Sequence, residues 1–279
     1  MFSPLRRLRV ILFCLPAFTS LVPISDAQNV TTWHNDNYRT GWQQNETILT
    51  QSNVNQSNFG LLWQWSVSGH VLAQPLAVAN VPTTFSNCTP SCNLVFISTE
   101  MDMLYAFNAA PSAQSNPLVW SVNLASQVAA TAVDCNNLNG VTFGACNAPS
   151  LSNGLIGVTG TPVIDTSANT LYVVGAVYFA GQSPTIAYYL FAVNIRSGAV
   201  LAKTPITATV PGQTLSNACS SANPLPGNTV SFTPSYHIQR SALLLLNGGV
   251  YVAFAPLPET YNGRLFGYQL SGGSQLSRD

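Results

Sequence analysis

Two acidic residues, two positions apart, have types and spacing that could carry acid–base or metal chemistry. Glu100 and Asp102 stand in the stretch "STEMDML". On an extended chain, alternate side chains point to the same side, so both carboxylates would face one point. Such a pair can act as general acid and base, or supply half of a cation site. The competing interpretation, which we favour, is a tight turn between two strands with both side chains exposed and solvated.

The elements around this pair are predicted from three similar hexapeptides. "LYAFNA", "LFAVNI" and "LFGYQL" begin at residues 104, 190 and 265. Each follows a run of β-branched and aromatic residues, "NLVFIST", "TLYVVGAV" and "GVYVAFA", and a further short strand pattern precedes each run. After the first two copies comes a fourth pattern, "PLVWSVNL" and "AVLAKTPI". Gly, Pro, Asn and Ser separate these patterns, which predicts meanders of four short strands.

The predicted fold class is all-β, because no stretch has the apolar periodicity of an amphipathic helix. Four-stranded antiparallel sheets repeated along a chain are typical of β-propeller blades. We expect about three blades, near residues 71–124, 156–207 and 229–279, the last one without its fourth strand. A β-sandwich is the alternative, but it does not explain the repeated hexapeptide.

A turn motif closes the second of these units. In "AVNIRSGAVLA", Asn194 can cap the turn, Ser197 can assist it, and Gly198 can adopt a positive φ. In the first unit, Asn108 and Trp120 stand at the two ends of a longer turn. The motif predicts how two strands are joined and does not by itself predict an activity.

The same string resembles the repeat of quinoprotein propellers, small-x-Asp-x-x-Thr-Gly-x-x-x-Trp. The stretch "TWHNDNYRTG", followed by "ILTQSNVNQSNFGLLWQWSV", is similar to the start of such propellers. The resemblance covers nearly all of the chain after its leader, and implies an N-terminal fragment of a secreted bacterial pyrroloquinoline-quinone-repeat protein. It also implies that a lead-in, residues 28–59, packs across the propeller through Trp33 and Arg39. Residues 60–67 would be a strand that closes the ring.

The resemblance does not extend to the cofactor ligands of quinoprotein dehydrogenases. Those enzymes need an aspartate base, a calcium ion held by carboxylate and amide oxygens, and a tryptophan beneath the cofactor. Many also have a disulfide between adjacent cysteines, and this sequence has no adjacent cysteines. We therefore assign no catalytic or cofactor-binding residue, and expect pyrroloquinoline quinone and calcium only if the chain is part of such a dehydrogenase. Zinc is not expected, because His34, His70 and His237 are far apart in the sequence.

The N-terminus has the pattern of a secretory signal peptide. Three arginines precede the apolar run "VILFCLPAFTSLVPI", and small residues lead to a cleavage site near Ala27. Residues 1–27 are therefore expected to be removed, and the protein to be secreted or periplasmic. No second long apolar run follows, so no membrane span is expected.

Five cysteines remain after the leader. In an exported chain their default role is disulfide formation. "NCTPSCN" predicts a bond between Cys88 and Cys92, and "CNNLNGVTFGAC" predicts one between Cys135 and Cys146. Cys219 has no local partner.

Low charge limits the possible partners. Charged residues make up 6% of the chain, and nucleic acids or anionic membranes require basic patches. We therefore expect a non-catalytic extracellular recognition or scaffold domain whose partner is an unknown extracellular ligand or downstream domains of the same protein. The alternatives are a fragment of a pyrroloquinoline-quinone-dependent dehydrogenase and a carbohydrate-binding propeller that uses its tryptophans. Arg240 either meets an anion or binds a backbone carbonyl at the start of a strand.

Overall fold

The chain is all-β in a computed structural model that describes most of it. The leader at residues 1–27 and Cys219 lie outside the described residues. The helical elements that lie wholly within the described residues are the short 3-10 helices η2 (Ala125–Val128), η3 (Gly144–Asn147) and η5 (Pro234–Tyr236). The described residues are 29–43, 46, 48–61, 63–110, 115–147, 154–211, 229–257, 263–271 and 275–278.

The first sheet is the predicted antiparallel meander of four strands. Its strands pair in chain order, so that each is bonded to the next. Along β2 (Ser91–Ser98) buried residues alternate with partly buried ones from Leu94 onward, as expected for a strand with one face in a core. The other strands are β1 (Leu76–Pro82), β3 (Met103–Asn108) and β4 (Leu118–Asn123).

The second sheet contains the next predicted unit and two additional strands. Its meander runs β7 (Val163–Asp165), β8 (Thr170–Phe179), β9 (Thr185–Asn194) and β10 (Val200–Pro205). The connection from the first sheet adds β5 (Thr131–Asp134), which pairs with the far end of β8, and β6 (Leu155–Ile156), which pairs with β5.

The third sheet is more complete than predicted. Its central strand, β15 (Gly249–Pro256), pairs with β14 (Leu244–Leu246), with β13 (His237–Ile238) and with β16 (Arg264–Ser271). A fourth strand of the meander, β17 (Gln275–Arg278), pairs with β16. The prediction that this unit lacks its fourth strand is therefore wrong. The sequence "QLSR" conceals the strand, because it lacks the run of apolar residues by which the other strands were recognised.

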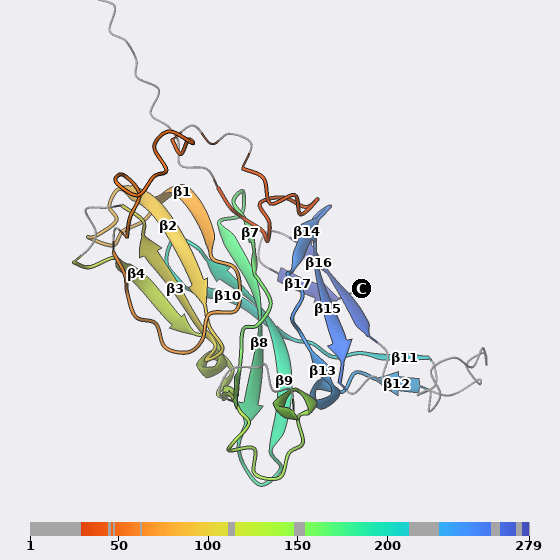
Figure 1. Ribbon diagram of the computed structural model, residues 1–279. Coiled ribbons are helices and arrows are strands. Elements are labelled where there is room, and N and C mark those ends of the chain that lie inside the picture. Colours follow the sequence, from red (N-terminus) through yellow and green to blue (C-terminus); the bar gives the residue numbers. More distant parts are fainter. Residues whose placement is uncertain are drawn as a thin grey trace, which may run out of the picture.

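A separate two-stranded ribbon joins the second and third sheets. It consists of β11 (Thr209–Pro211) and β12 (Thr229–Ser231). Figure 1 shows it extending to one side of the third sheet.

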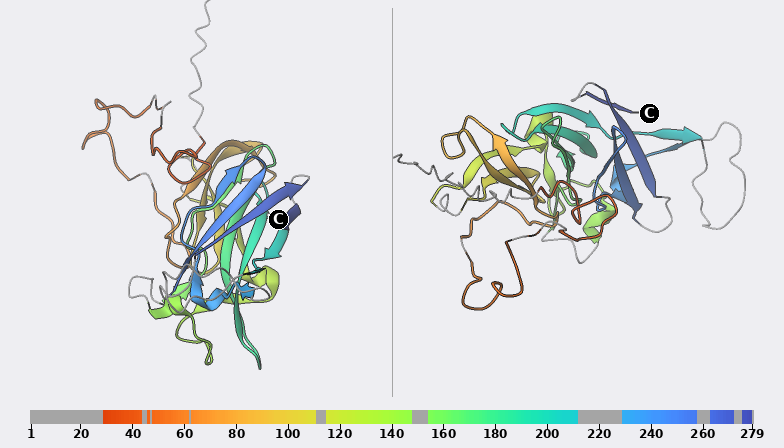
Figure 2. Two further views of the ribbon diagram at one scale, coloured as in Figure 1. Left: turned by 90° about the vertical axis from the view of Figure 1, so that its right-hand side faces the viewer. Right: turned by 90° about the horizontal axis from the view of Figure 1, so that it is seen from above.

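The three sheets lie side by side in chain order, each facing the next (Figures 1 and 2). One core fills the space between the first and second sheets and another the space between the second and third. Successive residues of β8 alternate between them: Leu171 and Val173 belong to the first core, and Tyr172 and Val174 to the second. The middle sheet is thus covered on both faces, which explains the continuous apolar run of β8. A sandwich of two sheets would have one core.

The turn between β9 and β10 has the geometry that its sequence predicts. The side-chain oxygen of Asn194 accepts a hydrogen bond from the Arg196 N–H at 2.9 Å, and its carbonyl accepts one from Gly198. The Ser197 hydroxyl accepts from the Ala199 N–H at 3.3 Å. Gly198 has φ +74°, a conformation that L side chains rarely adopt.

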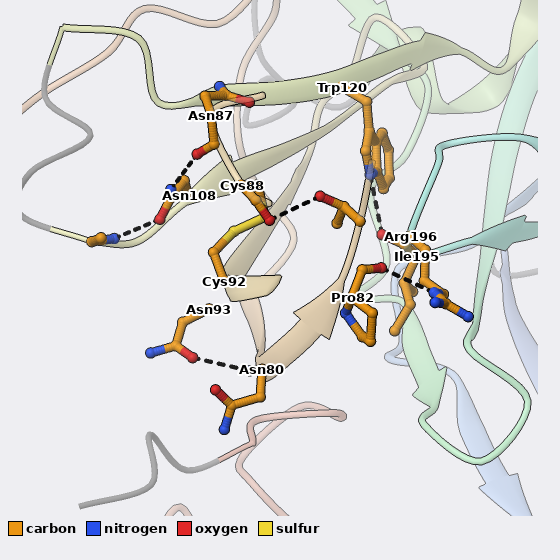
Figure 3. The surroundings of a disulfide bond; sticks show 12 residues. Asn80, Pro82, Asn87, Cys88, Cys92, Asn93, Asn108, Trp120, Ile195 and Arg196 are labelled. Carbon is orange, nitrogen blue, oxygen red and sulfur yellow. Dashed lines mark hydrogen bonds between the residues drawn. A yellow bond between two sulfur atoms is a disulfide. The ribbon is translucent and has the colours of Figure 1, made fainter. Parts of the chain in front are cut away.

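This turn also docks the first sheet onto the second (Figure 3). The indole Nε1 of Trp120, in β4, donates to the carbonyl of Ile195 at 3.1 Å. A Cβ on Gly198 would lie 2.7 Å from Trp120 Cε3, so only glycine allows the indole ring to approach the turn. Because Trp120 is 5% exposed, the contact is a buried junction between the sheets.

Both predicted disulfides are confirmed. Cys88 is bonded to Cys92, and Cys135 to Cys146. The first joins Cys88 in the connection between β1 and β2 to Cys92 in β2, near Asn108, whose amide donates to the carbonyl of Asn87 at 2.6 Å (Figure 3). The second closes a loop in the connection between β5 and β6. Each pair is local, which is why the spacing alone predicted it.

The lead-in crosses the first strand of each of the three meanders in turn. Val30 forms a β-bridge with Ala77 in β1. The carbonyl of Thr31 accepts a hydrogen bond from the N–H of Ile164 in β7 at 2.8 Å. The side chain of Asn37 then donates to the carbonyl of Leu245 in β14 at 3.0 Å. In Figure 1 this segment runs along the ends of β1, β7 and β14.

The predicted closing strand is not formed by the described residues of 60–67. Gly60, Leu61 and residues 63–67 form no strand. Apolar residues at alternate positions, with Trp63 and Trp65 among them, gave the segment a strand-like pattern. A strand needs a neighbour to receive its backbone hydrogen bonds, and no strand in the described ranges pairs with this segment. Its predicted neighbour is the last blade of a ring, so the role of this segment in closing a ring stays a prediction.

Candidate functional site

Arg39 fastens the lead-in to the third sheet. Its Nη1 donates to Thr32 Oγ1 at 2.5 Å and to the carbonyl of Trp33 at 2.8 Å, while Nη2 donates to the carbonyl of Leu243 at 3.1 Å. The Trp33 ring is stacked on His34, with 3.6 Å between ring centres, and the Arg39 guanidinium carbon lies 5.9 Å from the Trp33 ring centre. The structure therefore places both predicted lead-in residues in one cluster, with Arg39 as the hydrogen-bond donor.

Replacing Arg39 with methionine should loosen the lead-in. The change removes three hydrogen bonds from a charged donor, so we expect a loss of about 1–3 kcal/mol in the free energy of unfolding. Limited proteolysis should cut the variant within residues 29–43 faster than the original protein. Arg196→Met is the matched control, since this exposed arginine lies on the β9–β10 turn. Equal cleavage of both variants would contradict the anchoring role.

A pocket of about 470 Å³ opens beneath the lead-in. We call it the lead-in pocket. Its walls come from the lead-in and from the segments that immediately precede β1, β7 and β14. Each of these segments leads into the first strand of a meander, so the pocket lies where the starts of the three meanders come together. Its lining residues are Trp33, Arg39, Leu72, Thr159, Thr161, Arg240, Ser241 and Ala242.

Thr161 ties the walls of the pocket together. Its hydroxyl oxygen accepts a hydrogen bond from the N–H of Gln74 at 2.9 Å, and its carbonyl accepts one from the N–H of Leu243 at 2.9 Å. The Gln74 side chain in turn accepts from the N–H of His34 at 3.1 Å. All three sheet ends and the lead-in are thereby held in one network, which makes the pocket preformed.

Arg240 is an exposed residue of the third wall. No hydrogen bond from its side chain to another residue is found in the described part of the chain, so both alternatives for Arg240, meeting an anion or binding a backbone carbonyl, stay predictions. Its positive charge acts on Glu100, whose pKa it lowers slightly against a larger effect of burial. Arg240 is therefore available to a ligand on the pocket side.

Glu100 and Asp102 occupy the turn between β2 and β3, as predicted, but they are not exposed. Both residues have 0% of their surface accessible. The Glu100 N–H donates to the carbonyl of His70 at 3.0 Å, and Glu100 Oε2 accepts from the N–H of Gly157 at 2.9 Å. The expectation of a solvated turn is wrong because the second sheet covers it.

Two glycines of the second sheet make room for the Asp102 carboxylate. A Cβ on Gly157 would lie 2.9 Å from Asp102 Oδ1, and one on Gly175 would lie 2.6 Å from it. Neither carboxylate oxygen of Asp102 accepts a hydrogen bond, and neither does Glu100 Oε1. The two side chains are thus enclosed at the junction of the first and second sheets with three oxygens unsatisfied.

Burial controls the ionisation of this pair. Loss of hydration raises the pKa of Asp102 well above its ordinary value, and the neighbouring Glu100 charge raises it further. Burial also raises the pKa of Glu100, although the Gly157 N–H and the Thr159 side chain oppose the rise. Because two unpaired carboxylates cannot both be charged in such a place at low cost, we expect the pair to retain a proton above the usual carboxyl range.

The pair does not fit the chemistry first considered for it. In this conformation the three unsatisfied oxygens have almost no accessible surface, so a substrate cannot reach them. Calcium takes about six to eight oxygen ligands. In the described part of the chain, no three His, Cys, Asp or Glu side chains come together to hold a metal ion. The geometry favours a neutralised pair that joins two sheets.

Sequence reasoning missed the pocket's polar residues. Thr159 and Thr161 lie in "VTGTPVID", and their only signal was a pair of threonines beside a glycine and a proline at the start of a strand. Gln239 was also missed, although it is 2% exposed and its Oε1 accepts no hydrogen bond. It packs against the backbone of Gly160.

No helix in the described ranges is long and apolar enough to cross a membrane. Comparison with protein families and with curated proteins gave no match to this chain.

Proposed function

We propose that the chain is a secreted, non-catalytic recognition domain of the quinoprotein-like propeller kind, which binds an extracellular ligand in the lead-in pocket. One observation carries the proposal: the lead-in crosses the first strands of three consecutive meanders and forms an open, preformed pocket with the segments that precede them. Small-molecule sites are concave, largely preformed and of this size.

The arrangement of the sheets supports a propeller. Consecutive four-stranded meanders face one another through separate cores, as blades do around an axis. Trp120 docks on the turn of the following sheet. Its counterpart in the second sheet is Ala202, so the contact between the second and third sheets uses other residues.

Export is supported by the two disulfides. Such bonds persist in oxidising compartments and are rare in the cytosol. With the predicted leader, they favour a secreted or periplasmic protein.

The dehydrogenase alternative is tested with the cofactor itself. The purified secreted protein is dialysed against pyrroloquinoline quinone with calcium chloride, and alcohol oxidation is followed with an artificial electron-accepting dye. We expect no stoichiometric retention of the quinone and no oxidation above the protein-free rate. Stoichiometric binding together with dye reduction would contradict the proposed function.

A screen tests the pocket. Small extracellular metabolites are tested for an increase in the melting temperature, and each hit is repeated with Ala242→Phe, which fills the pocket. Ala202→Phe is the control, because Ala202 lies outside the pocket. Hits should be lost in the first variant and kept in the second. Hits that survive in Ala242→Phe would place recognition elsewhere.

A carbohydrate-binding role is favoured by one separate observation. Trp42 is 65% exposed and Trp65 is 47% exposed, and exposed indole faces can stack on sugar rings. This role predicts retention on a polysaccharide column that Trp42→Ala abolishes. Retention unchanged by the substitution would remove it.

A further inference from the structure

We propose that the ligand of the lead-in pocket is a small organic acid whose carboxylate pairs with Arg240. This inference rests on the proposed function, since it names the chemical class that the same pocket takes.

The lining of the pocket carries two positive charges and no acidic side chain. Arg39 and Arg240 both contribute to its surface. The nearest acids lie outside the lining: Asp36 is held by the hydroxyl and N–H of Thr40, and Glu100 is enclosed behind the second wall. In a chain with so few charged residues, two arginines on one pocket create a local positive potential that attracts anions.

The two arginines have different parts to play. The Arg39 guanidinium donates hydrogen bonds to Thr32, Trp33 and Leu243, which hold its charge in one position. Arg240 is exposed, and its side chain donates no hydrogen bond within the described part of the chain. Its planar guanidinium can therefore offer two parallel N–H groups to one carboxylate, the strongest form of this pairing.

The rest of the lining indicates that the anion is an organic molecule with an apolar part and hydroxyl groups. Trp33, Leu72 and Ala242 supply apolar surface, and the volume of about 470 Å³ is far larger than a bare inorganic anion needs. The Thr161 hydroxyl accepts from Gln74, which leaves its hydrogen for a ligand oxygen. Ser241 donates to the carbonyl of Ala253 at 3.0 Å, which leaves its oxygen lone pairs for a ligand hydroxyl.

Two matched pairs of probes isolate the carboxylate. D-galacturonate is compared with D-galactose, and benzoate with benzyl alcohol, by calorimetric titration of the whole secreted protein in a buffer without organic acids. We expect at least one acid to bind at least ten times more tightly than its neutral counterpart. Arg240→Gln should remove this preference, and Arg196→Gln, with the same change of charge on the β9–β10 turn, should keep it.

The outcomes separate the two proposals. Equal binding of acid and neutral probe, unchanged by Arg240→Gln, would overturn the organic-acid inference but leave recognition in the pocket standing. Failure of both acids to bind would also overturn the inference, while the Ala242→Phe screen would still test the pocket. A preference lost equally in both arginine variants would mean that net charge, and not the pocket, holds the anion.

Discussion

Replacing Trp120 with alanine should destabilise the protein more than any other single substitution considered for this chain. The indole is almost fully buried between the first and second sheets, and its Nε1 bonds to the carbonyl of Ile195. Truncation of a buried tryptophan typically lowers the free energy of unfolding by about 3–5 kcal/mol, because it removes apolar contacts and leaves a cavity. The carbonyl of Ile195 also loses its donor, which adds to the cost.

Denaturant unfolding followed by circular dichroism measures this effect. Trp42→Ala is the control, because it deletes the same side chain at a position that is 65% exposed, and it should change stability by less than about 1 kcal/mol. Gly198→Val should reproduce the loss from the other side of the contact, since its Cβ would meet the indole. If Trp120→Ala were as mild as Trp42→Ala, the junction between the sheets would not be the one described.

The second large expected effect is an increase in the free energy of unfolding, caused by a substitution at Asp102. Asp102→Asn should stabilise the protein at neutral and higher pH, because the amide keeps the shape of the side chain and stays neutral in both states, whereas the carboxyl group ionises in the unfolded chain. The pKa of Asp102 is raised in the folded state, so the folded protein holds a proton that the unfolded chain releases above about pH 4. As far as it depends on Asp102, the free energy of unfolding is therefore highest below the ordinary pKa of 3.8. It declines as the pH rises from there toward the raised pKa of the folded state.

This loss of unfolding free energy with rising pH determines at which pH Asp102→Asn is more stable than the original protein. Because the pKa of Asp102 is raised in the folded state, Asp102→Asn should raise the free energy of unfolding at pH 8 and change it little at pH 4. Glu100→Gln should show the same direction with a smaller gain, since Glu100 accepts a hydrogen bond from Gly157.

Unfolding free energies of the original protein and of Asp102→Asn, measured from pH 4 to pH 8, test this predicted stabilisation. Asp134→Asn is the control with the opposite sign: hydrogen bonds from the Asn136 N–H and the Asn137 side chain lower the pKa of Asp134. Compared with the original protein, Asp134→Asn should have an unchanged or slightly lower free energy of unfolding at the higher pH values. A loss of stability at pH 8 in Asp102→Asn would show that Asp102 is charged and held by a partner in the folded protein.

Local patterns predicted local structure. The β9–β10 turn follows from Asn194, Ser197 and Gly198 alone, and each disulfide joins cysteines with a short loop between them. The strands of the first two meanders were readable because apolar residues recur with turn residues between them. β17 was missed because it lacks such a run of apolar residues.

The candidate site could not be predicted in the same way. The burial of Glu100 and Asp102 depends on Gly157 and Gly175, which lie more than fifty residues later and have no pattern that links them to the turn. The lead-in pocket draws its walls from four segments of the chain. Arg240 was noticed as a charge beside an apolar strand, but only the position of the lead-in shows what it faces.

Hydrogen–deuterium exchange of the purified protein tests the central claim, recognition in the lead-in pocket, most directly. The measurement compares the free protein with the protein saturated by the tightest-binding of the two acids, D-galacturonate or benzoate. We predict slower exchange in three separate segments together, residues 30–40, 159–164 and 240–245, with the rest of the sheets unchanged. Protection confined to another region, or absent from all three segments at saturation, would contradict recognition in the lead-in pocket.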